Sequence, residues 1–198
     1  MARPKADSNK PSARERIETA FWDMLASVPF SQITVSAISS KAGVNHNTFY
    51  YHFSSIEDLA EKVFLDNMLP QLPLIMLPVL SGDQSKSGGL EEGDGPDPEV
   101  VSAHFRRARL YASSGSALLT GILRDSIMRL WLDTAGLEDS QLIPSERDQL
   151  AFIFGGIVSM IAEMGDEADV GRMAEMVGSP LGKGVLASLT AIATRERS

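Results

Sequence analysis

The stretch KAGVNHNTFYYHFSS, residues 41–55, decides the fold of this 198-residue chain. Four hydrogen-bonding side chains at 45–48 stand directly before five rings at 49–53. Two of the chain's three histidines and two of its three tyrosines lie in this stretch. Phe49 and Phe53 are four residues apart, which places both on one face of a helix. A short helix is therefore expected, with two buried phenylalanines and polar or ring side chains left for its other face.

The residues before this stretch predict a second helix that crosses it. Thr34 can cap a helix over 35–42, and Gly43 can take the positive φ that a tight turn needs. Ser39 is small enough to lie at the crossing of the two helices. The apolar anchors that the pair would bury are Val35, Ile38, Ala42, Val44, Phe49 and Phe53. These features predict a helix-turn-helix, whose second helix presents its first residues to base edges in the major groove.

The rest of the chain also has helical spacing, and strand signals are weak. A first helix starts at the capping box Ser12-Ala-Arg-Glu15 and ends before Pro29, and a fourth runs from Ile56 towards Met68. Further helices are expected at about 99–111, 117–135, 146–164, 170–177 and 181–194. Residues 81–98 are rich in Gly, Ser, Pro and acids, which predicts a mobile loop. The expected fold class is all-α.

Composition excludes several classes of protein. The chain has no cysteine, so disulfides, thiolate zinc sites and cysteine nucleophiles are excluded. The first residues have no apolar core, which argues against a secretory signal. The most apolar run, residues 69–80, is too short to span a bilayer and holds three prolines. We therefore expect a cytoplasmic protein without a membrane partner.

Charge is distributed unevenly along the chain, whose formal net charge is −8. The first 55 residues hold six Lys or Arg against four Asp or Glu, whereas the remainder holds twelve against twenty-two. The basic residues of the N-terminal tail and first helix are Arg3, Lys5, Lys10, Arg14 and Arg16. This pattern allows an N-terminal module that tolerates phosphate, carried on an acidic body.

Residues 33–59, ITVSAISSKAGVNHNTFYYHFSSIEDL, resemble the DNA-binding segment of the TetR family of bacterial transcriptional regulators. The similar features are the Thr-Val-x-x-Ile core, the Ala-Gly-Val turn and the Tyr-Tyr-His-Phe run, and the likeness extends over roughly 12–68. It implies a three-helix DNA-binding domain with a helix-turn-helix, followed by a helical domain for ligand binding and dimerisation. The expected divisions are a flexible basic tail at 1–11, the DNA-binding domain at 12–55 and the regulatory domain at 56–198.

The resemblance also implies which residues contact double-stranded DNA. Those expected near base edges are Asn45, His46, Asn47 and Thr48. Those expected at the backbone are Tyr50, Tyr51 and His52, with Thr34 at the cap of the supporting helix. Apart from the resemblance, Ser36 and Lys41 lie near the start and end of that helix, where they are available for further backbone contacts. Ile56 stands where the family usually has lysine, so one phosphate contact is expected to be missing. Asn47 replaces a residue that is commonly small, so the operator preference should be particular to this chain.

Other interpretations of the motif explain less. A helical hairpin with purely structural aromatics accounts for Phe49 and Phe53, but not for the other three rings. His46 and His52 lack a carboxylate or third histidine at ligand spacing, so no metal or other cofactor is expected. No nucleophile–base pair or phosphate-binding glycine loop has usable spacing, so we do not expect an enzyme.

The second half of the chain offers candidates for a ligand cavity and for a dimer interface. Candidate cavity residues are Phe105, Met128, Trp131, Phe152, Met160 and Met164, although the same residue types fill ordinary cores. Glu163 could face a cationic ligand or lie at the surface. Gly155 and Gly156 each cost a helix about 1 kcal/mol relative to alanine, which close helix–helix contact would offset. We expect a homodimer through helices at 146–164 and 181–194, unless the glycines mark a loop.

The predicted function is that of a repressor that binds a palindromic operator as a dimer. An unknown small-molecule effector, bound in the second domain, would release it. The alternative is a DNA-binding regulator whose second domain is controlled by a protein partner.

Overall fold

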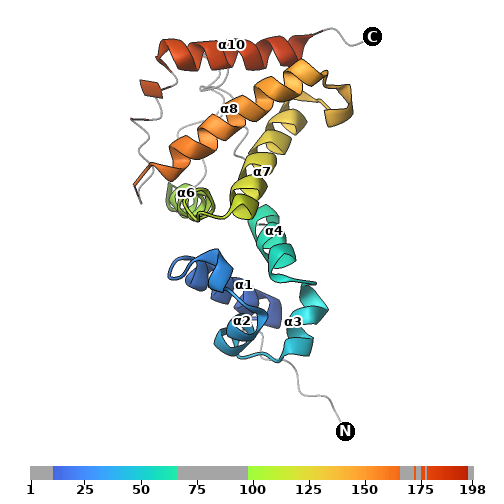
Figure 1. Cartoon of the computed structure of the whole chain (residues 1–198), viewed down its shortest axis with the longest axis vertical. Coiled ribbons are helices and arrows are strands. Elements are labelled where there is room, and N and C mark those ends of the chain that lie inside the picture. Colours follow the sequence, from blue (N-terminus) through green and yellow to red (C-terminus); the bar gives the residue numbers. More distant parts are fainter. Residues whose placement is uncertain (1–10, 67–97, 166–171, 173–174, 177, 196–198) are drawn as a thin grey trace. The chain divides into compact units, whose positions relative to one another are not determined.

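The computed structural model describes residues 11–66, 98–165, 172, 175–176 and 178–195. Every element within these ranges is helical, as the sequence predicted. The chain forms two compact units, Met1–Val63 and Phe64–Ser198. Figure 1 shows the helices in chain order, from α1 in blue to α10 in red. The basic residues of the tail up to Lys10, the apolar run at 69–80, the loop at 81–98 apart from Pro98, and most of the helix expected at 170–177 lie outside the described residues.

The first helix, α1, spans Ala13–Leu25 and begins with the predicted capping box. The Ser12 hydroxyl accepts a hydrogen bond from the Glu15 amide at 3.2 Å, and the Glu15 carboxylate accepts one from the Ser12 amide at 2.6 Å. Together these bonds satisfy two amides that have no partner within the helix. Ile17 and Phe21 are fully buried on the inner face. A 3₁₀ turn at Phe30–Gln32, which was not predicted, leads to the next helix.

Helix α2 spans Val35–Ala42, the bounds that the sequence predicted. The Thr34 hydroxyl caps it by accepting a hydrogen bond from the Ala37 amide at 3.2 Å. Gly43 ends it with φ +62°, a left-handed conformation that glycine adopts without steric cost. Ser39 is only 2% exposed, in agreement with its predicted place at the helix crossing.

Replacing Ser39 by alanine should stabilise the DNA-binding unit. The buried Ser39 hydroxyl has no hydrogen-bond partner among the described residues, and an unsatisfied buried polar atom costs about 1 kcal/mol or more. We expect Ser39→Ala to raise the free energy of unfolding by about 1 kcal/mol. Denaturant unfolding followed by Trp22 fluorescence, in a Trp131→Phe background, measures it. Ser40→Ala, at the next and exposed position, is the control. An equal gain in both variants would mean that helix propensity alone is responsible.

Helix α3 spans His46–His52, and α4 spans Ile56–Asp66. The start of α4 is capped twice: the Ser55 hydroxyl accepts from the Asp58 amide at 3.1 Å, and the Asp58 carboxylate accepts from the Ser54 amide at 2.8 Å. The inner face of α4 buries Leu59 and Val63 completely. The boundary between the two units falls within α4, after Val63.

The second unit contains four long helices and one further 3₁₀ turn in its described part. They are α6 (Pro98–Ala112), α7 (Ala117–Ala135), η3 (Asp139–Gln141), α8 (Pro144–Ala162) and α10 (Pro180–Thr194). α10 runs alongside α8 (Figure 1). The core cluster consists of Leu132, Leu137, Leu142, Leu150, Ile153, Phe154, Leu189 and Ile192. Gly155 and Gly156 lie inside α8, so the alternative of a loop at this position is wrong.

Two further contacts stabilise the second unit. Tyr111 of α6 is fully buried, and its ring centroid lies 4.7 Å from that of Phe64. This burial raises the pKa of the Tyr111 hydroxyl. Glu146 in the first turn of α8 is 5% exposed and receives two hydrogen bonds, of 2.6 and 3.0 Å, from Arg195 at the end of α10. These bonds raise the pKa of the Arg195 guanidinium and connect the two helices across 49 residues of sequence.

Candidate nucleic-acid interface

Helix α3 is anchored by two phenylalanines that face the core. Phe49 is fully buried and Phe53 is 1% exposed, with their ring centroids 5.9 Å apart. The guanidinium of Arg14 and the ammonium of Lys62 lie 5.7 and 6.0 Å from the centroid of Phe53. Cations at such distances are attracted to an aromatic ring. Because α3 is fixed along this side, its other face is held outward.

The outward face of α3 carries polar and aromatic side chains. His46 and Asn47 are exposed, Tyr50 is 56% exposed and Tyr51 is 84% exposed. The ring of Tyr51 stands nearly perpendicular to that of His52, with centroids 4.9 Å apart. The hydroxyl, amide and imidazole groups of such side chains can donate to and accept from base edges and phosphate oxygens. The face therefore has the chemistry that the motif predicted.

Asn45 and Thr48, both expected near bases, form the start of α3. The Asn45 carboxamide oxygen accepts hydrogen bonds from the Thr48 amide at 2.8 Å and from the Thr48 hydroxyl at 3.0 Å. This is an N-cap, and it commits that oxygen to the helix. Asn45, His46 and Asn47 are all exposed and Thr48 is partly buried, so the capping hydrogen bond and not burial separates Asn45 from His46 and Asn47. Contacts of these residues with DNA stay a prediction.

The three predicted contact residues of α2 have different surroundings. Thr34 caps the helix, and Ser36 is exposed in its first turn. Lys41 pairs with Asp23 of α1, with 3.2 Å between the ammonium nitrogen and the carboxylate oxygen. Asp23 was not singled out in the sequence, because it lies 18 positions before Lys41 and no local pattern links them. The carboxylate of Asp23 offsets part of the charge that Lys41 would present to a phosphate.

The described part of the first unit has four Lys or Arg side chains, and each has a partner within the unit. Arg14 pairs with Glu18 at 2.7 Å, Lys62 with Asp58 at 2.9 Å, and Lys41 with Asp23. Arg16 donates to two backbone carbonyls. Helix α3 itself has no Lys or Arg. The outward face is therefore polar and aromatic rather than cationic.

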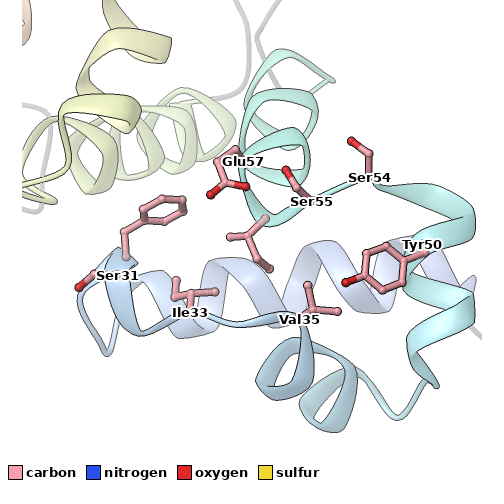
Figure 2. Close-up of a pocket in the computed structure, with 9 residues that line it drawn as sticks. Ser31, Ile33, Val35, Tyr50, Ser54, Ser55 and Glu57 are labelled. Atoms are coloured by element: carbon pink, nitrogen blue, oxygen red, sulfur yellow. The ribbon is translucent and has the colours of Figure 1, made fainter.

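An open hollow of about 300 Å³ lies beside α3. Figure 2 shows Tyr50 of α3 at one side of it, with Val35 and Ile33 along one edge and Glu57 of α4 opposite. Ile56, which stands where the TetR family usually has lysine, also lines the hollow and is 8% exposed. A hydrogen bond from the Ser55 hydroxyl holds the pKa of Glu57 below its ordinary value, so this wall of the hollow is anionic.

The candidate ligand-cavity residues of the second unit fall into three groups. Phe105, Met128, Trp131 and Met160 are partly buried, and Met164 is 3% exposed. Met128 and Trp131 pack against the core cluster. Phe152 is 79% exposed on α8, which places its ring outside the interior of the single chain. Glu163 is exposed at the end of α8.

No group of three or more His, Cys, Asp or Glu in the described ranges could hold a metal ion. No helix among the described segments is long and apolar enough to cross a bilayer.

A family comparison decides the identity of the first unit. Residues 20–63 match the model for bacterial regulatory proteins of the tetR family. The first unit has the DNA-binding helix-turn-helix of the TetR family. The match includes α2, α3 and the residues that cap them, Thr34 and Asn45. It therefore includes every residue predicted to contact DNA. The first unit is accordingly the DNA-binding helix-turn-helix domain of a transcriptional regulator.

One solved structure is similar to this chain over most of its length. The TetR family repressor AlkX from Dietzia sp. strain DQ12-45-1b, implicated in the biodegradation of n-alkanes, is 17% identical to it. The alignment covers 92% of this chain and 99% of AlkX, with a TM-score of 0.45. No curated protein matches the chain.

Proposed function

We propose that the protein is a homodimeric repressor that binds a palindromic DNA operator in the cytoplasm and is released by a small-molecule effector. The observation that carries this proposal is the polar outward face of α3, held in place by the buried rings of Phe49 and Phe53. A helix of this kind enters the major groove, and a dimer places two such helices in grooves about 34–36 Å apart.

The dimer part of the proposal is supported by the outward faces of α8 and α10. Phe152 on α8 is 79% exposed and Leu181 on α10 is 69% exposed, so each helix leaves a large apolar side chain in water in the single chain. Gly156 and Gly184 lie on the same helices with no described atom near the place of a Cβ. Small residues let a second helix approach closely, and the exposed rings and methyl groups supply apolar area. These features support a second copy of the chain as the partner of this surface.

The DNA-binding part can be tested by comparing two asparagines that differ in geometry. Asn47 is exposed without a described hydrogen bond, whereas Asn45 caps α3. We expect Asn47→Ala to change the sequence that the protein selects from a pool of random DNA fragments, because it removes a base-reading group.

Asn45→Ala should instead leave the selected sequence unchanged and lower the free energy of unfolding by about 1 kcal/mol, the usual value of an N-cap. Sequencing of bound fragments and denaturant unfolding of both variants measure the two effects. An identical preferred sequence for wild type and Asn47→Ala would remove Asn47 from the set of base readers.

The effector part rests on the aromatic and methionine side chains of the second unit. Met128 and Trp131 contact the core cluster but are only partly buried, so an apolar ligand could complete their burial. Such a ligand needs a coupling of only about 1–3 kcal/mol between its site and the DNA to cause release.

Trp131 provides a direct test of the effector site. The chain has two tryptophans, so Trp22→Phe leaves Trp131 as the sole reporter. We expect a compound that releases the selected DNA to change Trp131 fluorescence at the same concentration. Release by a protein fraction alone, with no active compound in a broad small-molecule set, would favour control by a protein partner.

A further inference from the structure

Arg16 connects α1 to the turn between α2 and α3. Its Nη1 donates hydrogen bonds to the carbonyl oxygens of Ala42 at 3.0 Å and of Gly43 at 3.2 Å. The same nitrogen would lie 3.5 Å from a Cβ placed on Gly43, so the guanidinium rests directly against the turn. The two carbonyls are 26 and 27 residues from Arg16 in the sequence, so no local motif predicts these hydrogen bonds.

The carbonyls at this point need a partner. The last carbonyls of a helix have no amide of their own helix to pair with, and they carry the negative end of the helix dipole. Arg16 supplies a fixed cation and two hydrogen bonds at that end of α2. Charge-assisted hydrogen bonds of this kind are stronger than those between neutral groups.

The position of the turn determines the position of the recognition helix. Gly43 and Val44 are the only residues between the end of α2 and Asn45, the N-cap of α3. A shift of the turn would therefore move His46 and Asn47 directly. The ion pair between Asp23 and Lys41 also connects α1 to the last turn of α2. Helix α1 therefore contacts the end of α2 at two places.

We propose that Arg16 is a positioning residue for operator recognition. Through the carbonyls of Ala42 and Gly43 it sets the approach of α3 to base edges, without itself contacting the DNA. The inference rests on the proposed function, because it presupposes a DNA sequence that the protein prefers. A positioning residue differs from a phosphate contact in one measurable respect. Its removal leaves the dependence of DNA binding on salt unchanged, whereas removal of a phosphate contact weakens that dependence.

The test uses the full-length chain and two DNA probes of equal length. One is a fragment that the wild type recovers from a pool of random sequence, and the other is an unrelated fragment. Arg16→Ala, Arg16→Lys and the control Arg124→Gln are compared with the wild type by fluorescence anisotropy at several salt concentrations. Arg124 is also held in an ion pair, with Asp125, but it lies on α7 of the second unit. Circular dichroism establishes that each variant is folded at the assay temperature.

We expect Arg16→Ala to lower affinity for the selected fragment about tenfold, a difference of about 1.4 kcal/mol. Affinity for the unrelated fragment and the slope of log K against log salt should stay unchanged. Arg16→Lys should restore most of the loss, because an ammonium can also donate to both carbonyls, and Arg124→Gln should bind within about twofold of the wild type. If Arg16→Ala does not fold, Arg16→Lys is used for the test. The ratio of its affinity for the selected fragment to its affinity for the unrelated fragment should fall by a few fold.

Two results would overturn the inference alone. Equal losses on both fragments, with a salt slope smaller by about 0.9 per protomer, would make Arg16 a phosphate contact. Unchanged selectivity in a folded Arg16→Ala variant would make its role purely structural. A wild-type protein that recovers no preferred fragment would overturn the proposed function and this inference with it.

Discussion

Phe49→Ala should unfold the DNA-binding unit and abolish operator binding, while the second unit stays folded. Phe49 is fully buried on α3, against Phe53. Truncation of a buried phenylalanine costs about 3–5 kcal/mol. A unit of this size has a stability near the lower end of about 5–15 kcal/mol, so the loss removes most or all of it. Denaturant unfolding followed by Trp22 fluorescence, in a Trp131→Phe background, measures the change.

Tyr50→Ala is the matched control for this variant. Tyr50 is the next residue of α3 and loses a similar volume on truncation, but it is 56% exposed. We expect it to cost less than about 1 kcal/mol of stability, as surface substitutions usually do, while still weakening DNA binding. Equal stability of the two variants would contradict the arrangement of α3 described above. Retention of specific DNA binding by Phe49→Ala would contradict it too.

Phe152→Asp should convert the proposed dimer into monomers. Phe152 points away from the core on α8, and an aromatic anchor at the centre of an interface is worth about 2–4 kcal/mol. The carboxylate would add the cost of removing a charge from water. We expect the dimer dissociation constant to rise at least a hundredfold, measured by sedimentation velocity over a range of concentrations. Operator affinity should fall with it, because each monomer then holds only one half-site.

The control for Phe152→Asp places the same charge elsewhere on α8. Ala151 is also exposed, and it is turned about 100° around the helix from Phe152. Ala151→Asp should leave the dissociation constant within about a few fold. The interface would be wrongly assigned if Phe152→Asp dimerised like the wild type. A wild type that is monomeric at micromolar concentrations would remove the dimer from the proposed function.

Much of the fold could be predicted from local patterns. The capping box at Ser12 and Glu15 located the start of α1, and Thr34 with Gly43 gave both ends of α2. Helix α7 also has the predicted bounds, Ala117–Ala135. The two 3₁₀ turns, Phe30–Gln32 and Asp139–Gln141, were missed because three residues are too few to show a hydrophobic period.

The candidate site was predictable in composition and only partly in geometry. The motif identified the outward residues His46, Asn47 and Tyr51, since they follow from the spacing of Phe49 and Phe53. It did not separate Asn45, which caps the helix, from Asn47, which does not. That distinction depends on the residue at which α3 begins, and helix ends are less strongly determined by periodicity than helix interiors.

The sequence by itself determined the helices, the helix-turn-helix and the polar face of α3, because these arise from contacts between residues one to four positions apart. Only the tertiary structure decided which distant groups meet: Arg16 with the turn after α2, Lys41 with Asp23, and Glu146 with Arg195. It also decided that the ring of Phe152 lies outside the protomer. The physical reason is that a charged or aromatic side chain can pair with many partners at similar energy. The packing of the helices selects among them, and that packing is set by the whole chain.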